Sequence, residues 1–193
     1  MKSGSIIGPA RKAKNSFEVK SMSAIFKKKP RKEPSLKLNH HFVFIEASIN
    51  AVGPEAMNWG ESAWWPKGAS LQFQRVGEGP LMIGSKFEMK VQALFGPRFV
   101  VEVTQLIPNR LLEFTYRRGF IIGSESIKIE ERANGTRIDY ELHYRIKGLF
   151  PKILWLLLFE KQHNASLKRI LDALKEYILN LKDMHRERQL GDR

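Results

Sequence analysis

The sequence of 193 residues contains no cysteine, and this absence excludes several kinds of site. Without thiols the chain cannot form a disulfide framework, use a cysteine nucleophile, or hold an iron–sulfur cluster or a cysteine-ligated zinc ion. The sequence also lacks a run of about 18 apolar residues, which a membrane-spanning helix needs. With 42% hydrophobic residues the chain is still apolar enough to fold, and its length suits one domain with a complete core.

Acidic residues are scarce beside basic ones, 20 against 33, which gives a formal net charge of +13. Residues 1–34 hold ten Lys and Arg against Glu18 and Glu33, so this segment carries +8 and the rest of the chain +5. The segment shows no sustained apolar period. We therefore expect a flexible basic leader over 1–35, a folded domain over 36–185 and a polar tail over 186–193.

The leader predicts certain partners and argues against others. Its basic cluster, residues 26–32, could make weak contact with an anionic membrane. Specific nucleic-acid binding is not expected, because the domain itself keeps only a small excess of base. There is no secretory apolar region, so we expect a cytoplasmic protein, with a peripheral position at the membrane as an alternative. Translation could start at Met1 or at Met22, and no pattern indicates an oligomeric state.

Most of the domain has the two-residue period of β-strands. Residues 41–47 form an apolar-rich run typical of a buried strand, and residues 112–117 and 137–146 alternate cleanly between apolar and polar side chains. Asn134-Gly135 favours a tight hairpin turn before the last of these. Further strands are predicted over residues 71–73, 87–91, 99–106 and 127–130.

Helical patterns flank these strands. Residues 48–66 indicate two short helices after the first strand, and residues 167–184 carry one apolar stripe with a period near 3.6. Residues 153–159 are apolar on every side and are expected to be buried, or to dip into a membrane interface. The fold class is thus α+β, with a curved antiparallel sheet gripping a long C-terminal helix.

Several apparent motifs do not amount to sites. His40 and His41 are adjacent on a strand and point to opposite faces, so they cannot chelate one metal ion. Gly77, Gly79 and Gly84 lead into a strand rather than a helix, so they form no phosphate cradle. No catalytic residue, metal site or cofactor is therefore assigned.

The aromatic residues give the largest signal for a ligand pocket. Trp59, Trp64 and Trp65 lie in an irregular segment, where they could form a pocket mouth or lid; a packed core is the alternative. A strongly curved sheet around one helix can enclose a cavity lined with such side chains. The predicted pocket residues are Trp64, Trp65, Phe73, Phe87, Met89, Phe114, Tyr116, Ile127, Tyr140, Tyr144 and Trp155.

Four charged residues fall in phase with the inward apolar set: Arg75, Arg118, Glu125 and Glu131. A buried unpaired charge is costly, so each is either paired or located at a strand end near water. The sharper hypothesis is that Arg75, Arg118 or Glu125 fixes a polar group of the ligand, with tyrosines as partners.

The order of these motifs resembles that of the SRPBCC superfamily, also called START-like or pollen-allergen-like, and most nearly its polyketide cyclase/dehydrase-type branch. The resemblance covers roughly residues 36–182. It is carried by Trp64-Trp65-Pro66, Arg75-Val76-Gly77 to Gly84, Pro108-Asn109-Arg110-Leu111-Leu112, Asn134 to Tyr140, and His163 to Tyr177.

This resemblance implies a helix-grip fold of seven strands wrapped around the C-terminal helix and a hydrophobic cavity. One departure from the family is expected, because Gly53-Pro54 interrupts the helix that follows the first strand. The function implied is binding or transport of a hydrophobic small molecule such as a lipid, polyketide or quinone. The alternatives are a cyclase or dehydratase without metal or nucleotide cofactor, and a peripheral membrane or scaffold protein acting through the leader.

Overall fold

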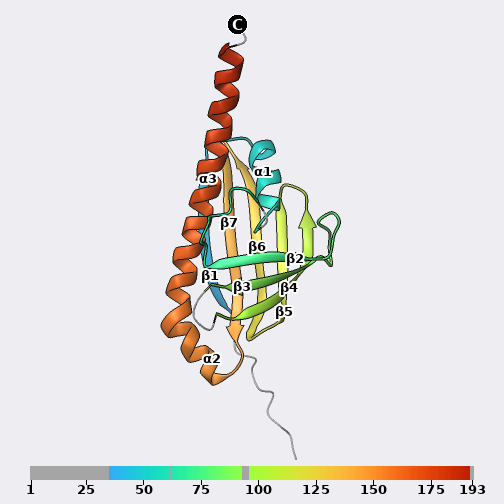
Figure 1. Cartoon of the computed structure of the whole chain (residues 1–193), viewed down its shortest axis with the longest axis vertical. Coiled ribbons are helices and arrows are strands. Elements are labelled where there is room, and N and C mark those ends of the chain that lie inside the picture. Colours follow the sequence, from blue (N-terminus) through green and yellow to red (C-terminus); the bar gives the residue numbers. More distant parts are fainter. Residues whose placement is uncertain (1–34, 61, 93–95, 192–193) are drawn as a thin grey trace, which may run out of the picture. The chain divides into compact units, whose positions relative to one another are not determined.

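Seven antiparallel strands form one sheet in the order β1-β7-β6-β5-β4-β3-β2 in this computed structural model (Figure 1). Because β1 pairs with β7, the first and last strands lie side by side, and every other pair is formed by strands that follow one another in the chain. The strands are β1 (Lys37–Ile45), β2 (Leu71–Val76), β3 (Lys86–Val91), β4 (Arg98–Ile107), β5 (Leu111–Arg118), β6 (Ile121–Arg132) and β7 (Gly135–Ile146).

The structure describes residues 35–60, 62–92 and 96–191, all within one unit that spans Pro34–Arg193. The predicted leader, and with it the basic cluster 26–32 and Met22, lies outside the described residues. At the other end, the C-terminal helix continues to Gly191, through most of the segment predicted as a tail. The division of the chain at residue 35 therefore stays a prediction.

The predicted alternation of faces holds along β7. Ile138, Tyr140, Leu142 and Tyr144 are buried on the inner face of the sheet, and the outer residues between them are mostly half-exposed. Strand β6 is longer than predicted, because it begins at Ile121 and pairs with β7 over its whole length.

One helix, α1 (Ile49–Met57), follows β1, instead of the two short helices predicted there. It also runs through Gly53 and Pro54, so the predicted interruption of the helix at this point is wrong. Glycine is needed at position 53 for a packing reason, since a Cβ there would lie 2.5 Å from the Cβ of Asn109. The helix thus packs closely against the turn between β4 and β5.

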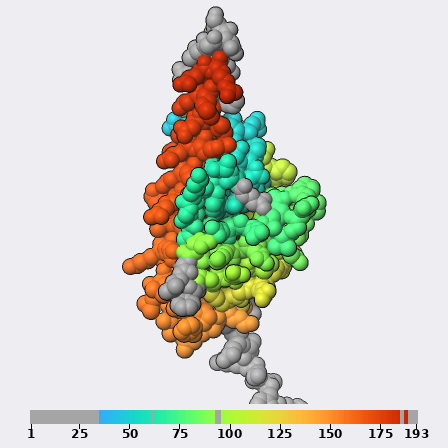
Figure 2. Space-filling view, in the orientation of Figure 1, coloured from blue at the N-terminus to red at the C-terminus, as the bar shows by residue number. Residues whose placement is uncertain are grey.

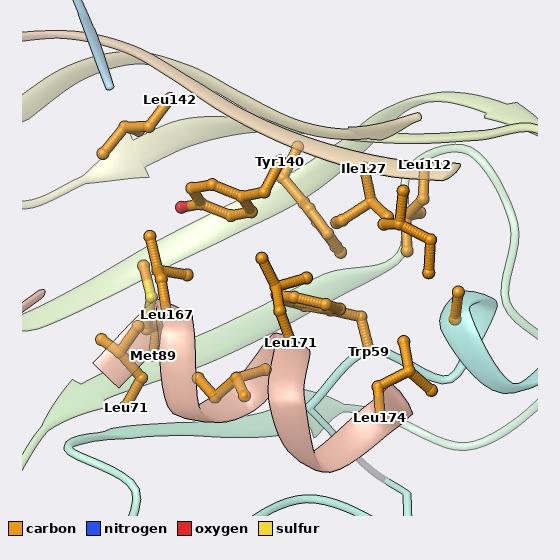
Figure 3. Packing of buried hydrophobic residues seen from close by; sticks show 14 of the residues in the cluster. Trp59, Leu71, Met89, Leu112, Ile127, Tyr140, Leu142, Leu167, Leu171 and Leu174 are labelled. Carbon is orange, nitrogen blue, oxygen red and sulfur yellow. The ribbon is translucent and has the colours of Figure 1, made fainter. Parts of the chain in front are cut away.

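The last third of the chain is helical in three joined pieces: α2 (Leu149–Leu154), the five-residue π-helix η1 (Trp155–Phe159) and α3 (Glu160–Gly191). Helix α3 buries its apolar stripe, Leu167, Ile170, Leu171, Leu174 and Ile178, against the inner face of the sheet. Figure 3 shows this stripe facing inward-pointing residues of the strands. The predicted helix-grip fold of a curved sheet around a long helix is confirmed.

Candidate functional site

A small apolar cavity of about 20 Å³ lies between the inner face of the sheet and the helices. Residues of β2, β3, β4, β5, β6, η1 and α3 contribute to its wall. They are Leu71, Met89, Val91, Phe99, Tyr116, Ile121, Trp155, Phe159, Gln162 and His163, with Ser70 just before β2. The cavity is far smaller than the large aromatic-lined space predicted from the sequence.

Three indoles pack as part of the core or against it and do not line this cavity. Trp59 is buried, its ring stacks on Tyr140 with centroids 5.9 Å apart, and it contacts both Trp64 and Trp65 edge-on. The N–H groups of Trp64 and Trp65 donate to the carbonyl oxygens of Glu55 and Leu71. Since Trp59 and Trp64 are buried and tied to the core, the hypothesis that the tryptophans form a lid is not supported by their positions.

Glu125 is the central polar residue of this interior. It is 1% exposed, and its Oε2 atom accepts hydrogen bonds from the hydroxyl groups of Tyr116, at 2.9 Å, and Tyr140, at 3.0 Å. Its other oxygen, Oε1, is buried with no hydrogen-bond partner among the described residues. The prediction that Glu125 points inward is confirmed by this geometry.

Burial determines the protonation of this cluster. It raises the pKa of Glu125 to about 7, although the two tyrosine hydrogen bonds pull in the opposite direction. Burial, and then the nearby Glu125, holds the pKa of Tyr116 and of Tyr140 well above the usual value. The carboxyl group can therefore give up or accept a proton near neutral pH, whereas both phenols stay protonated.

His163, on the first turns of α3, is a second buried polar residue beside the cavity. Its ring lies 6.3 Å from that of Tyr140 and 5.7 Å from that of Trp155, and its Nε2 atom has no hydrogen-bond partner within the described part of the chain. Burial, helped by His41, lowers its pKa to about 4, so the imidazole is neutral at pH 7. The sequence predicts no site role for His163, although its position four residues before Leu167 places it in phase with the buried stripe.

A hydrogen-bonded chain connects the sheet to the helical end of the cavity. The indole N–H of Trp155 donates to the hydroxyl of Tyr144, at 3.2 Å, and that hydroxyl donates to the carboxylate of Glu160, at 3.4 Å. Trp155 and Phe159 are the buried residues of η1, and both line the cavity. The π-helix is thus held to β7 by its first side chain.

The predicted pocket residues are brought to one side of the sheet, but few of them reach the cavity. Met89, Tyr116 and Trp155 line it. The others pack around it as core or half-buried residues: Trp64, Trp65, Phe73, Phe87, Phe114, Ile127, Tyr140 and Tyr144.

Two predicted inward charges point elsewhere. Arg118 is exposed, because the register shifts between Val100 and Val101 and turns the end of β5 away from the interior. Glu131 is also exposed. Arg75 takes an intermediate position: it is half-buried, donates from Nη1 to the carbonyl oxygen of Gly79, and lies 5.6 Å from the ring of Phe87.

A second, open hollow of about 760 Å³ crosses β2, β3 and β4. Charged and amide side chains make up much of its wall, which makes it a poor match for an apolar ligand. Its lining includes Trp65, Gln72, Phe73, Gln74, Glu88, Met89, Lys90, Arg98, Phe99 and Arg118. In the part of the chain that the structure describes, no group of three or more histidine or carboxylate side chains could hold a metal ion.

One family model matches this chain over residues 44–178, that of the polyketide cyclase/dehydrase and lipid transport family. No curated protein matches the sequence. Among solved structures, a protein of Thermus thermophilus is similar with a TM-score of 0.59 and 15% identity, over 75% of this chain and 99% of that one. Norcoclaurine synthase from Thalictrum flavum, in complex with dopamine and hydroxybenzaldehyde, is similar with a TM-score of 0.57 and 18% identity. This similarity covers 75% of this chain and 87% of the synthase chain. The structure of Ara h 8.0201 is similar with a TM-score of 0.55 and 12% identity, over 75% of this chain and 99% of that one.

The structural similarities, at these identities, establish the fold alone. The family match is broader evidence, since it extends from the end of β1 to the buried part of α3 and so includes Glu125 and His163. The resemblance to the SRPBCC superfamily is thereby confirmed, and the chain belongs to its polyketide cyclase/dehydrase and lipid transport family.

Proposed function

We propose that this domain binds a hydrophobic small molecule between the sheet and α3, with one polar group of the ligand directed at Glu125 and His163. The observation that carries the proposal is the pair of buried atoms without partners, Glu125 Oε1 and His163 Nε2, among the described residues of an otherwise apolar interior. An unsatisfied buried polar atom costs about 1–3 kcal/mol, and such atoms usually have a reason to persist. A ligand hydroxyl or amine could satisfy one or both.

The size of the cavity constrains how such a ligand enters. A volume of about 20 Å³ has room for about one water molecule, whereas small-molecule sites typically measure about 300–1,000 Å³. Binding therefore requires part of the wall to move. We assign this movement to η1, where Trp155 donates a hydrogen bond to Tyr144 and the three leucines that follow are exposed.

A fluorescent probe tests the proposal directly. N-phenyl-1-naphthylamine has an apolar body and a single N–H donor, so it combines the two features the site requires. We expect saturable binding with one probe per chain, weakened about tenfold or more by Glu125→Gln, which replaces the free acceptor by a donor. Glu131→Gln, at an exposed position of the same strand, is the matched control and leaves the affinity unchanged.

Two results would count against this site. Probe binding without saturation would show that the interior does not open to a ligand. Saturable binding that Glu125→Gln and Glu131→Gln alter equally would place the probe elsewhere, for instance in the hollow over β2 to β4.

The pKa of Glu125 favours acid–base catalysis as a second candidate function. A carboxyl group with a pKa of about 7, joined to two protonated tyrosines, is suited to proton transfer at neutral pH. In that case a poly-β-ketone mimic would be converted by the wild type and not by Glu125→Gln, while Glu131→Gln would retain full activity. If the wild type binds the mimic without converting it, catalysis is excluded for this substrate and only the binding function is supported.

A further inference from the structure

The segment Leu149–Leu158 exposes a dense group of large apolar side chains, here called the apolar tip. Six of its residues are between 44% and 76% exposed: Leu149, Phe150, Ile153, Leu156, Leu157 and Leu158. They come from ten consecutive positions of α2 and η1, so they form one continuous surface rather than scattered contacts. In Figure 2 this end of the helical region is the orange surface, with α3 rising away from it. Apolar side chains gathered in this way mark an interaction surface.

Three lysines lie within or next to the apolar tip in the sequence. Lys147, Lys152 and Lys161 are exposed beside it. Between Lys147 and Phe159 the sequence contains no acidic residue. The next residue, Glu160, is half-buried and accepts a hydrogen bond from the hydroxyl of Tyr144, so its carboxylate is turned toward the domain.

We infer that the apolar tip docks on the surface of an anionic lipid bilayer, with its leucines in the acyl boundary and its lysines among the headgroups. The combination of apolar side chains with a basic rim suits such an interface, and α2 with η1 is far too short to cross it. Within the described residues, no helix of the chain is long and apolar enough to span a membrane. A protein partner would need no particular charge opposite the tip, whereas three exposed lysines, with no acidic residue between Lys147 and Phe159, favour phospholipid.

This inference is independent of the proposed ligand site, but the two meet in η1. The outward side of this π-helix carries Leu156, Leu157 and Leu158, while its inward side carries Trp155 and Phe159, which line the cavity. A bilayer that takes up the leucines would therefore contact the same segment that closes the interior.

The absence of cysteine makes a site-specific test straightforward. Leu157→Cys in the full chain carries a single thiol, which can be labelled with the polarity-sensitive dye NBD. Addition of vesicles of phosphatidylcholine and phosphatidylglycerol should shift the dye emission to the blue and increase it severalfold. The same label at Ile83→Cys, a similarly exposed apolar position on the turn before β3, should not respond.

Vesicle sedimentation supplies the matching energetic test with the unlabelled full chain. Leu157→Glu should weaken partition onto the vesicles by about tenfold or more. The substitution removes a leucine side chain that would be buried in the bilayer, and it adds a negative charge. Lys152→Glu should weaken this partition on phosphatidylglycerol vesicles far more than on pure phosphatidylcholine. Ile83→Glu should bind as the wild type does, and unchanged thermal unfolding would show that each variant is folded.

Three outcomes would overturn the inference. The NBD label at position 157 could fail to respond to vesicles. Binding could survive Leu157→Glu and disappear only when Lys27, Lys28 and Lys29 are replaced by glutamine, which would assign it to the leader. Finally, sedimentation velocity could show a dimer that Leu157→Glu dissociates, without vesicle binding, which would make the tip a contact between two copies of the chain.

Discussion

Two buried groups of this domain titrate in the same pH range with opposite effects on stability. Glu125 has a folded pKa of about 7 against an ordinary value of 4.5, and His163 has a folded pKa of about 4 against 6.5. Tyr140 lies between them, donating to one and contacting the ring of the other. Their contributions can be separated because both groups are almost fully buried and their pKa values move in opposite directions.

The sign for Glu125 follows from its raised pKa. Between pH 4.5 and about 7 the folded protein keeps a proton that the unfolded chain has lost, so the stability from this group is complete below pH 4.5 and is lost as the pH rises through about 7. One pKa unit corresponds to a tenfold change in the folding equilibrium, so the total loss is about 3 kcal/mol.

For His163 the pKa is lowered, and the sign is reversed. Between about pH 4 and 6.5 the unfolded chain binds a proton that the folded protein does not, so stability from this group is complete above pH 6.5 and is lost as the pH falls through about 4. The magnitude is again about 3 kcal/mol. Between pH 4.5 and 6.5 the two contributions therefore offset each other.

Urea denaturation across that range should show the two slopes separately. In Glu125→Gln the unfolding constant should fall about tenfold per pH unit as the pH rises, because His163 then acts alone. In His163→Gln it should rise by the same factor, and the double variant should return to the shallow profile of the wild type. The slope is the quantity to compare, since each substitution also changes the absolute stability.

Parallel profiles for the wild type and both single variants would refute this reasoning. They would show that neither group changes its protonation on unfolding, and so that neither is buried in the way described. A wild type that loses stability steeply with rising pH, while His163→Gln does the same, would retain Glu125 as a titrating group and remove His163.

Three further substitutions test particular contacts. Tyr140→Phe removes one of the two donors to Glu125, so it should raise the pKa of that carboxyl further and lower the free energy of unfolding by about 1 kcal/mol. NMR titration of the side-chain carboxyl would measure the first change and urea denaturation the second. A lower pKa of Glu125 would contradict the hydrogen bond. Thr136→Val removes a buried hydroxyl that donates to the carbonyl oxygen of Ala47, at 2.8 Å, and should cost about 1–2 kcal/mol in urea, whereas Thr136→Ser should retain most of the stability. Gly123→Ala would drive a Cβ into a carbonyl oxygen of β7 and should prevent normal folding. Gly79→Ala, also at positive φ but with open space around it, should cost only about 1 kcal/mol of the free energy of unfolding. Equal melting temperatures for the two variants would contradict the close contact between Gly123 and β7.

The strand faces could be predicted because they follow a two-residue period that survives in the folded protein. Along β7 the alternation of Ile138, Tyr140 and Leu142 with polar residues is complete, and the turn that begins the strand is marked by local sequence. The beginning of β6 could not be predicted in this way, since Gly123 and the serines beside it give no periodic signal. That segment is a strand because β7 pairs with it, which is a tertiary effect.

The candidate site was only partly predictable for a similar reason. Phase with Ile127 located Glu125 correctly, but the same argument failed for Arg118, since a register shift at the end of β5 is invisible in the sequence. His163 was expected to be a helix contact rather than a ligand, because a single histidine on a helix carries no signal of its own until the buried stripe is extended to it. The packing of Trp59 against Tyr140, which makes this tryptophan part of the core, is a tertiary contact that no pattern of residue types specifies.

The π-helix between α2 and α3 also fixes a phase relation along the chain. Its wider turn accommodates one more residue than an α-helical turn of the same kind. Loss of any one residue from Leu156–Leu158 would let the segment become continuous α-helix with α2 in nearly the same orientation relative to α3, because the π-turn holds one extra residue. Loss of two residues would instead rotate everything before the deletion by about 100° and change the surroundings of the exposed leucines and of Trp155, which lines the cavity. A two-codon deletion in this run should therefore be more harmful than a single-codon deletion.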